Sequence, residues 1–215
     1  MSTIDAVLFD FGGVFTVSPF HAVMDYASSL GGDPQATLQL VFGDYGVDGD
    51  HPWHRLERGE MTLEAARDAI LERSTRDLGQ PIDLYSFLMA MASDPDKTVR
   101  QPMIDYATAL RREGRAMAII TNNVLEFKDA WRGMMPVDEL FDAVIDSSEV
   151  GVRKPHPDIY RMALDQMNIS DPARAVFLDD LDSNVDAARA LGMHGIRVDD
   201  DYRPAMQALN QLLGR

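Results

Sequence analysis

Short apolar segments alternate with helical segments along most of the chain, and this pattern constrains the fold more than any other feature. Strands are predicted at residues 4–9, 116–120, 141–145, 175–178 and 194–198. Helices are predicted around the last four of them, at residues 103–113, 124–131, 158–167, 183–191 and 203–213. An apolar run without helical period fits a strand that is buried on both faces. Because alternating strands and helices form right-handed βαβ units, the sequence predicts an α/β fold with a doubly wound parallel sheet.

A long helical segment, residues 18–92, separates the first strand from the others. Pro19 and Asp33 mark helix starts, and Thr62 is placed to cap a helix that extends to about Leu78. Shorter helices are expected within residues 51–61 and 81–91. The 215 residues suffice for one core and a small accessory domain. The expected organisation is a core domain of residues 1–17 and 93–215 that carries an inserted helical domain of residues 18–92.

The amino-acid composition argues against several classes of binding partner and of site chemistry. The net charge of −15 argues against a surface for nucleic acid or for an anionic membrane, since such partners require a basic footprint. The chain has no cysteine, which excludes disulfides, thiolate catalysis and thiolate metal sites. Neither a signal pattern nor a run of about 18 apolar residues is present. We therefore expect a cytoplasmic protein that binds neither nucleic acid nor a membrane, as a monomer or a homodimer.

Polar residues recur where each apolar strand ends. These residues are Asp10, Thr121, Asp146, and Asp179 with Asp180. Lys154 belongs to a loop that leaves the same edge of the predicted sheet. Taken singly, each is typical of a strand-end cap or a solvated loop, but the carboxyl ends of parallel strands meet in one crevice. Carboxylates, a hydroxyl and a lysine brought together in this way suit a hard cation and an anionic oxygen group.

Four motifs that contain these residues resemble those of the haloacid dehalogenase-like superfamily, in the usual order. They read VLFDFGGV, ITNN, SSEVGVRKPHPDIY and FLDDLDSNVDAARALGM. The sequence is most similar to the group with a small helical cap, which includes the N-terminal phosphatase domain of soluble epoxide hydrolases, and LERGEMTLEAA in residues 18–92 also resembles that group. The resemblance implies a Rossmann-like core with a small inserted helical cap, and a phosphatase acting on a small phosphorylated metabolite.

The resemblance also implies a role for each motif residue in phosphoryl transfer. Asp10 would be the nucleophile and would form an aspartyl-phosphate that water hydrolyses. Thr121 and the amide of Asn122 would hold the transferring oxygens, and Lys154 would neutralise the phosphoryl group.

A Mg²⁺ site is implied by the same motifs. Asp180, Asp10 and a backbone carbonyl near Gly12 would bind the ion, which favours oxygen ligands. Asp179 would orient Lys154 or support the metal site, and Asn184 would do so from the first turn of the next helix.

Gly12 departs from the usual phosphatase pattern, in which a second aspartate at this position acts as general acid. Loss of a general acid typically costs about 10² to 10⁴ in rate, or about 3 to 5 kcal/mol. The chain is therefore expected to favour substrates with good leaving groups, or to receive the proton from the cap or the substrate. Two alternatives remain: a 2-haloacid dehalogenase-type hydrolase, or a non-catalytic phosphate-binding module. The Asp179-Asp180 pair favours phosphoryl transfer over dehalogenation, which needs no metal.

The inserted segment is expected to determine specificity, because a cap that closes over a site excludes water. Its candidate residues are His21, His51, Trp53, His54 and Arg55. We expect one cap histidine, with His54 as the named candidate for substrate binding, to replace the missing aspartate. The alternative is that these histidines are solvated or packed, and that Trp53 is a packing aromatic. Methionines such as Met89, Met91, Met134 and Met135 are typical of core packing, although the region around Trp131 offers a small apolar contact.

Overall fold

The computed structural model describes residues 3–93 and 99–215; residues 1–2 and 94–98 of the predicted core domain lie outside the described part. One parallel sheet forms the centre of the fold, with strand order β3-β2-β1-β4-β5. The strands are β1 (Ala6–Phe9), β2 (Ala116–Thr121), β3 (Ala143–Asp146), β4 (Ala175–Asp179) and β5 (His194–Arg197). The predicted parallel α/β sheet is confirmed. Because the strand order reverses on either side of β1, the crevice beside it is where such sheets bind ligands.

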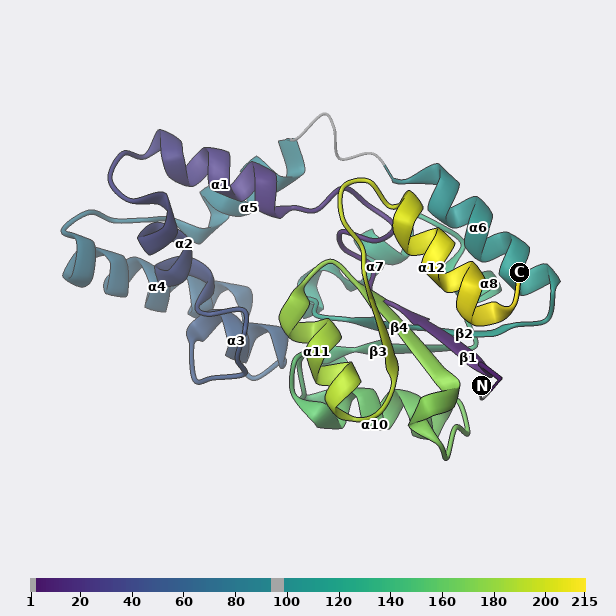
Figure 1. The fold of residues 1–215 in the computed structure, drawn as a ribbon. Coiled ribbons are helices and arrows are strands. Elements are labelled where there is room, and N and C mark those ends of the chain that lie inside the picture. Colours follow the sequence, from purple (N-terminus) through teal and green to yellow (C-terminus); the bar gives the residue numbers. More distant parts are fainter. Residues whose placement is uncertain (1–2, 94–98) are drawn as a thin grey trace.

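Helices cover both faces of this sheet (Figure 1). On one face, Val7 and Phe9 of β1 pack with α6 (Gln101–Arg112), α8 (Val137–Leu140) and α12 (Arg203–Leu213). On the other face, Ala6 and Leu8 pack with α10 (Pro157–Gln166) and α11 (Asp182–Ala190). Successive strand side chains point to opposite faces, so a strand covered on both sides must be apolar throughout. This is why β1 reads as an unbroken apolar run.

Local differences from the sequence prediction concern short elements. The helix expected at residues 124–131 is a 3-10 turn, η1 (Leu125–Phe127), followed by α7 (Lys128–Arg132). The strand expected at residues 141–145 begins at Ala143, since Phe141 ends α8, where its N–H donates to Val137. Helices α8 and α9 (Ser147–Val150) and the 3-10 turn η2 (Pro172–Arg174) were not expected, because three or four residues are too few to show a helical period.

The segment between β1 and α6 is helical, as predicted. Its helices are α1 (Phe20–Ser29), α2 (Pro34–Phe42), α3 (Pro52–Glu57), α4 (Leu63–Leu78) and α5 (Leu84–Ser93). The Thr62 side chain accepts from the Ala65 N–H and caps α4, which ends at the left-handed Gly79. These helices pack around an apolar cluster that also includes Val124 and is contacted by Phe127, and they lie to one side of the sheet in Figure 1. No helix in the described residues is long and apolar enough to cross a membrane.

An antiparallel bridge between Thr16 and Val99 joins the two points where the chain leaves and re-enters the sheet-bearing part. Together with the apolar cluster that α1–α5 largely form, this bridge supports our proposal that residues 1–17 and 93–215 form the core domain and residues 18–92 the cap.

Candidate active site

Three carboxylates meet at the carboxyl edge of the sheet. Asp10 follows β1, Asp179 ends β4, and Asp180 is the next residue. One oxygen from each lies within 4.8 Å of the other two. Asp10 and Asp179 are buried, and Thr121, at the end of neighbouring β2, is buried beside them. The structure thus brings together the strand-end residues expected from the sequence, with one exception.

The exception is Asp146 at the end of β3. Its carboxylate accepts from the N–H and hydroxyl of Ser148 and from the side chain of Asn123. The bond from the Ser148 N–H caps α9, and Asp146 does not line the cavity beside the carboxylates. It is a structural residue.

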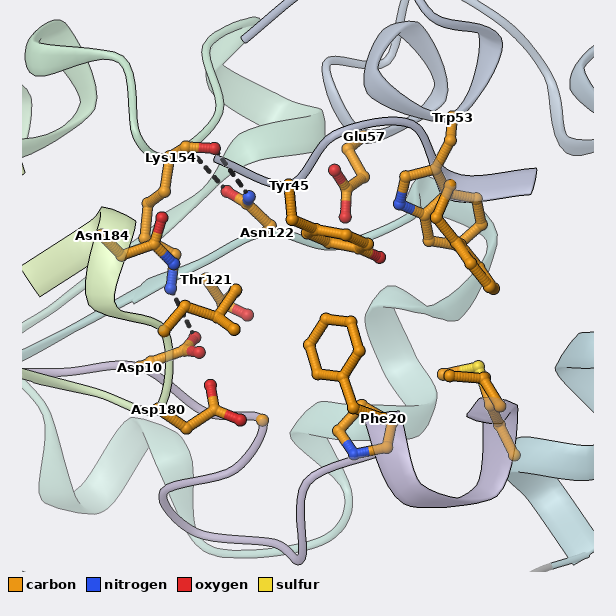
Figure 2. Close-up of a pocket in the computed structure, with 16 residues that line it drawn as sticks. Asp10, Phe20, Tyr45, Trp53, Glu57, Thr121, Asn122, Lys154, Asp180 and Asn184 are labelled. Atoms are coloured by element: carbon orange, nitrogen blue, oxygen red, sulfur yellow. Dashed lines mark hydrogen bonds and ion pairs between the residues drawn. The ribbon is translucent and has the colours of Figure 1, made fainter. Parts of the chain in front are cut away.

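Lys154 lies between two of the carboxylates. Its Nζ is 2.8 Å from Asp10 Oδ1 (Figure 2). The same Nζ is 2.7 Å from Asp179 Oδ2, and the side chain is buried. The Asn122 side chain fixes this loop, because it accepts from the Lys154 N–H at 2.7 Å and donates to the Lys154 carbonyl at 3.0 Å. Asn122 therefore positions Lys154, a role that its sequence context did not indicate. Phosphate binding by the Asn122 amide stays a prediction.

Burial dominates the electrostatics of the site. Burial raises the pKa of Asp10 to about 8, although the ion pair with Lys154 acts in the opposite direction. Burial and the neighbouring Asp179 raise the pKa of Asp180 to about 6. Burial alone would lower the pKa of Lys154, but the carboxylates of Asp10 and Asp179 raise it above its ordinary value. The lysine therefore stays charged, and one positive charge faces three acidic groups.

These residues fit a Mg²⁺ ion. Three converging carboxylates supply the oxygen ligands that this ion prefers, and its charge would favour the ionised form of Asp10. Asn184 supports the arrangement: its Nδ2 donates to both oxygens of Asp179. Its Oδ1 is buried and accepts no hydrogen bond from the residues that the structure describes. This oxygen is a suitable acceptor for a water molecule held by the ion, as expected for a residue that supports a metal site.

Gly13 is required by the position of Asp180. Its φ is +72°, and a Cβ at this residue would lie 2.1 Å from Asp180 Oδ2. We expect Gly13→Ala to displace Asp180 and weaken Mg²⁺ binding about 10- to 100-fold, measured by calorimetric titration. Gly79→Ala is the matched control, since Gly79 has a φ of +70° but no atom near the added Cβ. Equal Mg²⁺ affinity in both variants would contradict the role given to Asp180.

Mg²⁺ is also expected to stabilise the folded chain, because the unfolded chain lacks the carboxylate cluster. At a concentration 100-fold above Kd, binding adds about 2.7 kcal/mol to the free energy of unfolding. For a chain of this size, that corresponds to a rise in Tm of roughly 5–10 °C. Thermal denaturation with and without Mg²⁺ checks this, with Asp180→Asn as the variant that should lose the rise. An equal rise in Asp180→Asn would place the ion elsewhere.

A cavity of about 140 Å³ adjoins the carboxylates. The core contributes the motif residues, and the cap contributes the opposite wall. The residues lining that wall include Phe20, Tyr45, Trp53 and Glu57 (Figure 2). Trp53 also packs edge-on against Phe42, so it has both the packing role expected for it and a place in the wall. The other three cap residues were not predicted, because their sequence positions show no motif.

None of the cap histidines lines this cavity. His54 is buried, its Nδ1 accepts from the Gly49 N–H, and burial lowers its pKa to about 4. The His51 side chain caps α3. His21 is exposed, and its Nε2 lies 3.1 Å from Asp200 Oδ2. The structure thus does not support a histidine as the replacement for the second aspartate. These histidines pack or face solvent, which was the alternative expectation.

Arg55 lies outside the cavity lining as well. Its guanidinium contacts the exposed side chains of Asp50 and Glu60. A different arginine, Arg153, holds a residue of the cavity wall. Arg153 is fully buried, and its Nε donates to Glu57 Oε2 at 2.7 Å. This ion pair joins α3 of the cap to the loop that carries Lys154.

A family model for haloacid dehalogenase-like hydrolases matches residues 4–192. The chain belongs to this family. The match includes the carboxylate cluster and Lys154, so the resemblance of the four motifs is confirmed.

The relatives of this chain include a bifunctional epoxide hydrolase and a sesquiterpene phosphatase. The chain is 30% identical over 218 residues to bifunctional epoxide hydrolase 2 of Rattus norvegicus, covering 96% of this chain but 38% of that protein. It is 29% identical over 218 residues to a sesquiterpene phosphatase of Aspergillus oryzae, covering 99% and 98% of the two chains. The chain thus spans well under half of the epoxide hydrolase and almost the whole of the phosphatase.

Solved structures of haloacid dehalogenase-like enzymes share the fold. One from Bacteroides thetaiotaomicron, in complex with magnesium and inorganic phosphate, superposes with a TM-score of 0.67 at 21% identity, covering 92% of this chain and 96% of that one. A dehalogenase superposes with a TM-score of 0.67 at 19% identity, covering 100% and 99%. At these identities the likeness shows the fold and leaves the reaction open between phosphate and halide chemistry.

Proposed function

We propose that this hydrolase is a Mg²⁺-dependent phosphatase that acts on a small phosphorylated compound through an aspartyl-phosphate on Asp10. The observation that carries the proposal is Lys154 Nζ, held between Asp10 and Asp179 beside a third carboxylate. Displacement of halide from carbon needs no metal ion, so it does not require a cluster of carboxylates suited to a divalent cation. The phosphatase relative and the magnesium–phosphate complex of a structural neighbour agree with this choice.

The proposed reaction has two steps at Asp10. First, a carboxylate oxygen of Asp10 attacks phosphorus, and the bond from phosphorus to the leaving oxygen breaks with its electron pair on that oxygen. Second, water attacks the phosphorus of the aspartyl-phosphate, which releases phosphate and restores the carboxylate. Lys154 would offset the negative charge on the transferring oxygens, and the Thr121 hydroxyl would donate a hydrogen bond to one of them. Mg²⁺ held by Asp10, Asp180 and the backbone near Gly12 would supply further positive charge to the phosphoryl group.

The leaving oxygen receives no proton from residue 12, because Gly12 has no side chain. We therefore expect p-nitrophenyl and acyl phosphates to be hydrolysed much faster than simple alkyl phosphates. In Gly12→Asp the added Cβ meets no atom within 4 Å. This variant should raise kcat for short alkyl phosphates on the order of 10²-fold, and should change kcat for p-nitrophenyl phosphate much less.

A phosphate-release assay over a panel of aryl, acyl, sugar and alkyl phosphates, with and without Mg²⁺, tests both the function and the leaving-group preference. Equal rates across the panel would show that a cap group or the substrate supplies the proton. No release from any member would contradict the phosphatase.

A 2-haloacid dehalogenase is the second candidate, because that reaction needs no second aspartate and a dehalogenase shares the fold. Halide release from 2-haloacids in the same buffers decides between the two. Mg²⁺-independent halide release without phosphate release would favour the dehalogenase, and phosphate binding without either release would favour a binding module.

A further inference from the structure

A second, larger cavity lies beside the catalytic one, between the cap and the core. Its volume is about 730 Å³. We call it the apolar cleft; its walls include Phe11, Val17, Leu63, Leu88, Phe127 and Trp131. None of the residues that line it carries a charge. In a chain with 55 charged residues this is a distinct environment, unsuited to a sugar or a nucleotide and suited to hydrocarbon.

The apolar cleft meets the catalytic cavity at Gly12. Gly12, Pro19 and Met91 line both cavities. A Cβ at Gly12 would meet no atom within 4 Å, and its φ lies outside the left-handed region, so neither packing nor backbone conformation requires glycine here. The missing side chain therefore leaves space where the two cavities adjoin, at the residue next but one to the nucleophile.

Part of the apolar cleft faces solvent. Tyr85 and Met134 are each 39% exposed, and Met89 is 63% exposed. Met89 and Met134 are thus not the core-packing residues that the sequence suggested, whereas Met135 is buried. An exposed apolar surface of this kind in a highly charged protein commonly marks a binding site.

We propose that the apolar cleft binds the hydrocarbon part of the substrate, so that the substrate is a phosphorylated compound with a long hydrocarbon chain that passes over Gly12. The inference rests on the proposed phosphatase activity. The continuity of the two cavities at Gly12 favours a single ligand that occupies both over a separate protein partner. The phosphate would lie against Lys154 and the carboxylates, and the chain against the uncharged walls.

A series of n-alkyl phosphates from four to twelve carbons tests this directly with the full chain and Mg²⁺. We expect kcat/KM to rise by up to about fourfold for each methylene that is buried, and then to level off when the cleft is full. Ala130→Trp places a large side chain into the cleft from an exposed helix position. It should flatten the dependence of kcat/KM on chain length. Ala190→Trp, at an exposed position on α11 outside the lining, is the matched control.

Binding of n-alkylphosphonates, measured by calorimetry, gives a readout that does not need turnover. Affinity that rises with chain length and falls in Ala130→Trp supports the proposal, even for a chain that releases no phosphate. If p-nitrophenyl phosphate is hydrolysed but neither kcat/KM nor affinity depends on chain length, the inference is wrong and the phosphatase stands. A dimer in sedimentation that Ala130→Trp disrupts, again without chain-length dependence, would assign the cleft to a second copy and overturn the proposal.

Discussion

Asp10→Asn is expected to reduce phosphate release on the order of 10⁴-fold or more, because the amide cannot attack phosphorus and removing a nucleophile abolishes the covalent route. The change is nearly isosteric. Lys154 keeps its 2.7 Å ion pair with Asp179, so the geometry around the site is expected to persist. Initial rates with p-nitrophenyl phosphate and Mg²⁺ measure the loss.

Folding of Asp10→Asn is not expected to suffer. Burial raises the pKa of Asp10, which means that the fold disfavours its charged form, and an uncharged amide removes that cost. Asp199→Asn is the matched control: it changes the net charge equally, but its side chain is 71% exposed and lies outside the catalytic cavity. A folded Asp10→Asn protein with activity close to that of Asp199→Asn would exclude Asp10 as the nucleophile.

Arg153→Met is expected to lower the free energy of unfolding by about 3–5 kcal/mol, because it leaves Glu57 buried without its partner. Arg153 is fully buried; its Nε donates to Glu57 at 2.7 Å, and its Nη1 donates to the Val47 carbonyl at 2.7 Å. The loss corresponds to a fall in Tm of roughly 6–20 °C for a chain of this size. Thermal or urea denaturation measures it.

The loss of unfolding free energy caused by Arg153→Met should increase as the pH rises. Burial raises the pKa of Glu57 above its ordinary value of 4.5, and Arg153 partly offsets this effect. Without Arg153 the folded-state pKa rises further, so above pH 4.5 the folded chain binds more protons than the unfolded chain. Stability then falls with increasing pH until the folded-state pKa is passed. The variant is therefore expected to be less impaired at pH 5 than at pH 8.

Two further variants distinguish the stability contributed by the Glu57–Arg153 ion pair from the effect of losing any arginine. Arg161→Met removes an exposed pair with Asp158 and should cost at most about 1 kcal/mol. The double variant Glu57→Gln/Arg153→Met should recover part of the stability, since no unpaired charge remains. If Arg153→Met costs no more than Arg161→Met, the pair between cap and core does not contribute to stability as argued.

The sheet and most of the candidate active-site edge follow from local sequence pattern. Strands buried on both faces must be apolar throughout, so β1, β2 and β4 stand out from the amphipathic helices around them. The polar residue that ends each run then lies at the carboxyl edge in any parallel arrangement, which is why the convergence of Asp10, Thr121 and Asp179 was predictable.

Which polar residues contribute to the site at that edge, and which residues face them, depends on the three-dimensional packing. Asp146 ends a strand like the others but caps α9, and a capping bond leaves no periodic signal in the sequence. Asn122 holds the backbone of Lys154, which lies 32 residues away along the chain. The cap wall and the apolar cleft are formed by residues far apart in sequence, such as Glu57 with Arg153 and Leu88 with Trp131. Their meeting depends on how a helical insert packs against the sheet, which local sequence pattern does not specify.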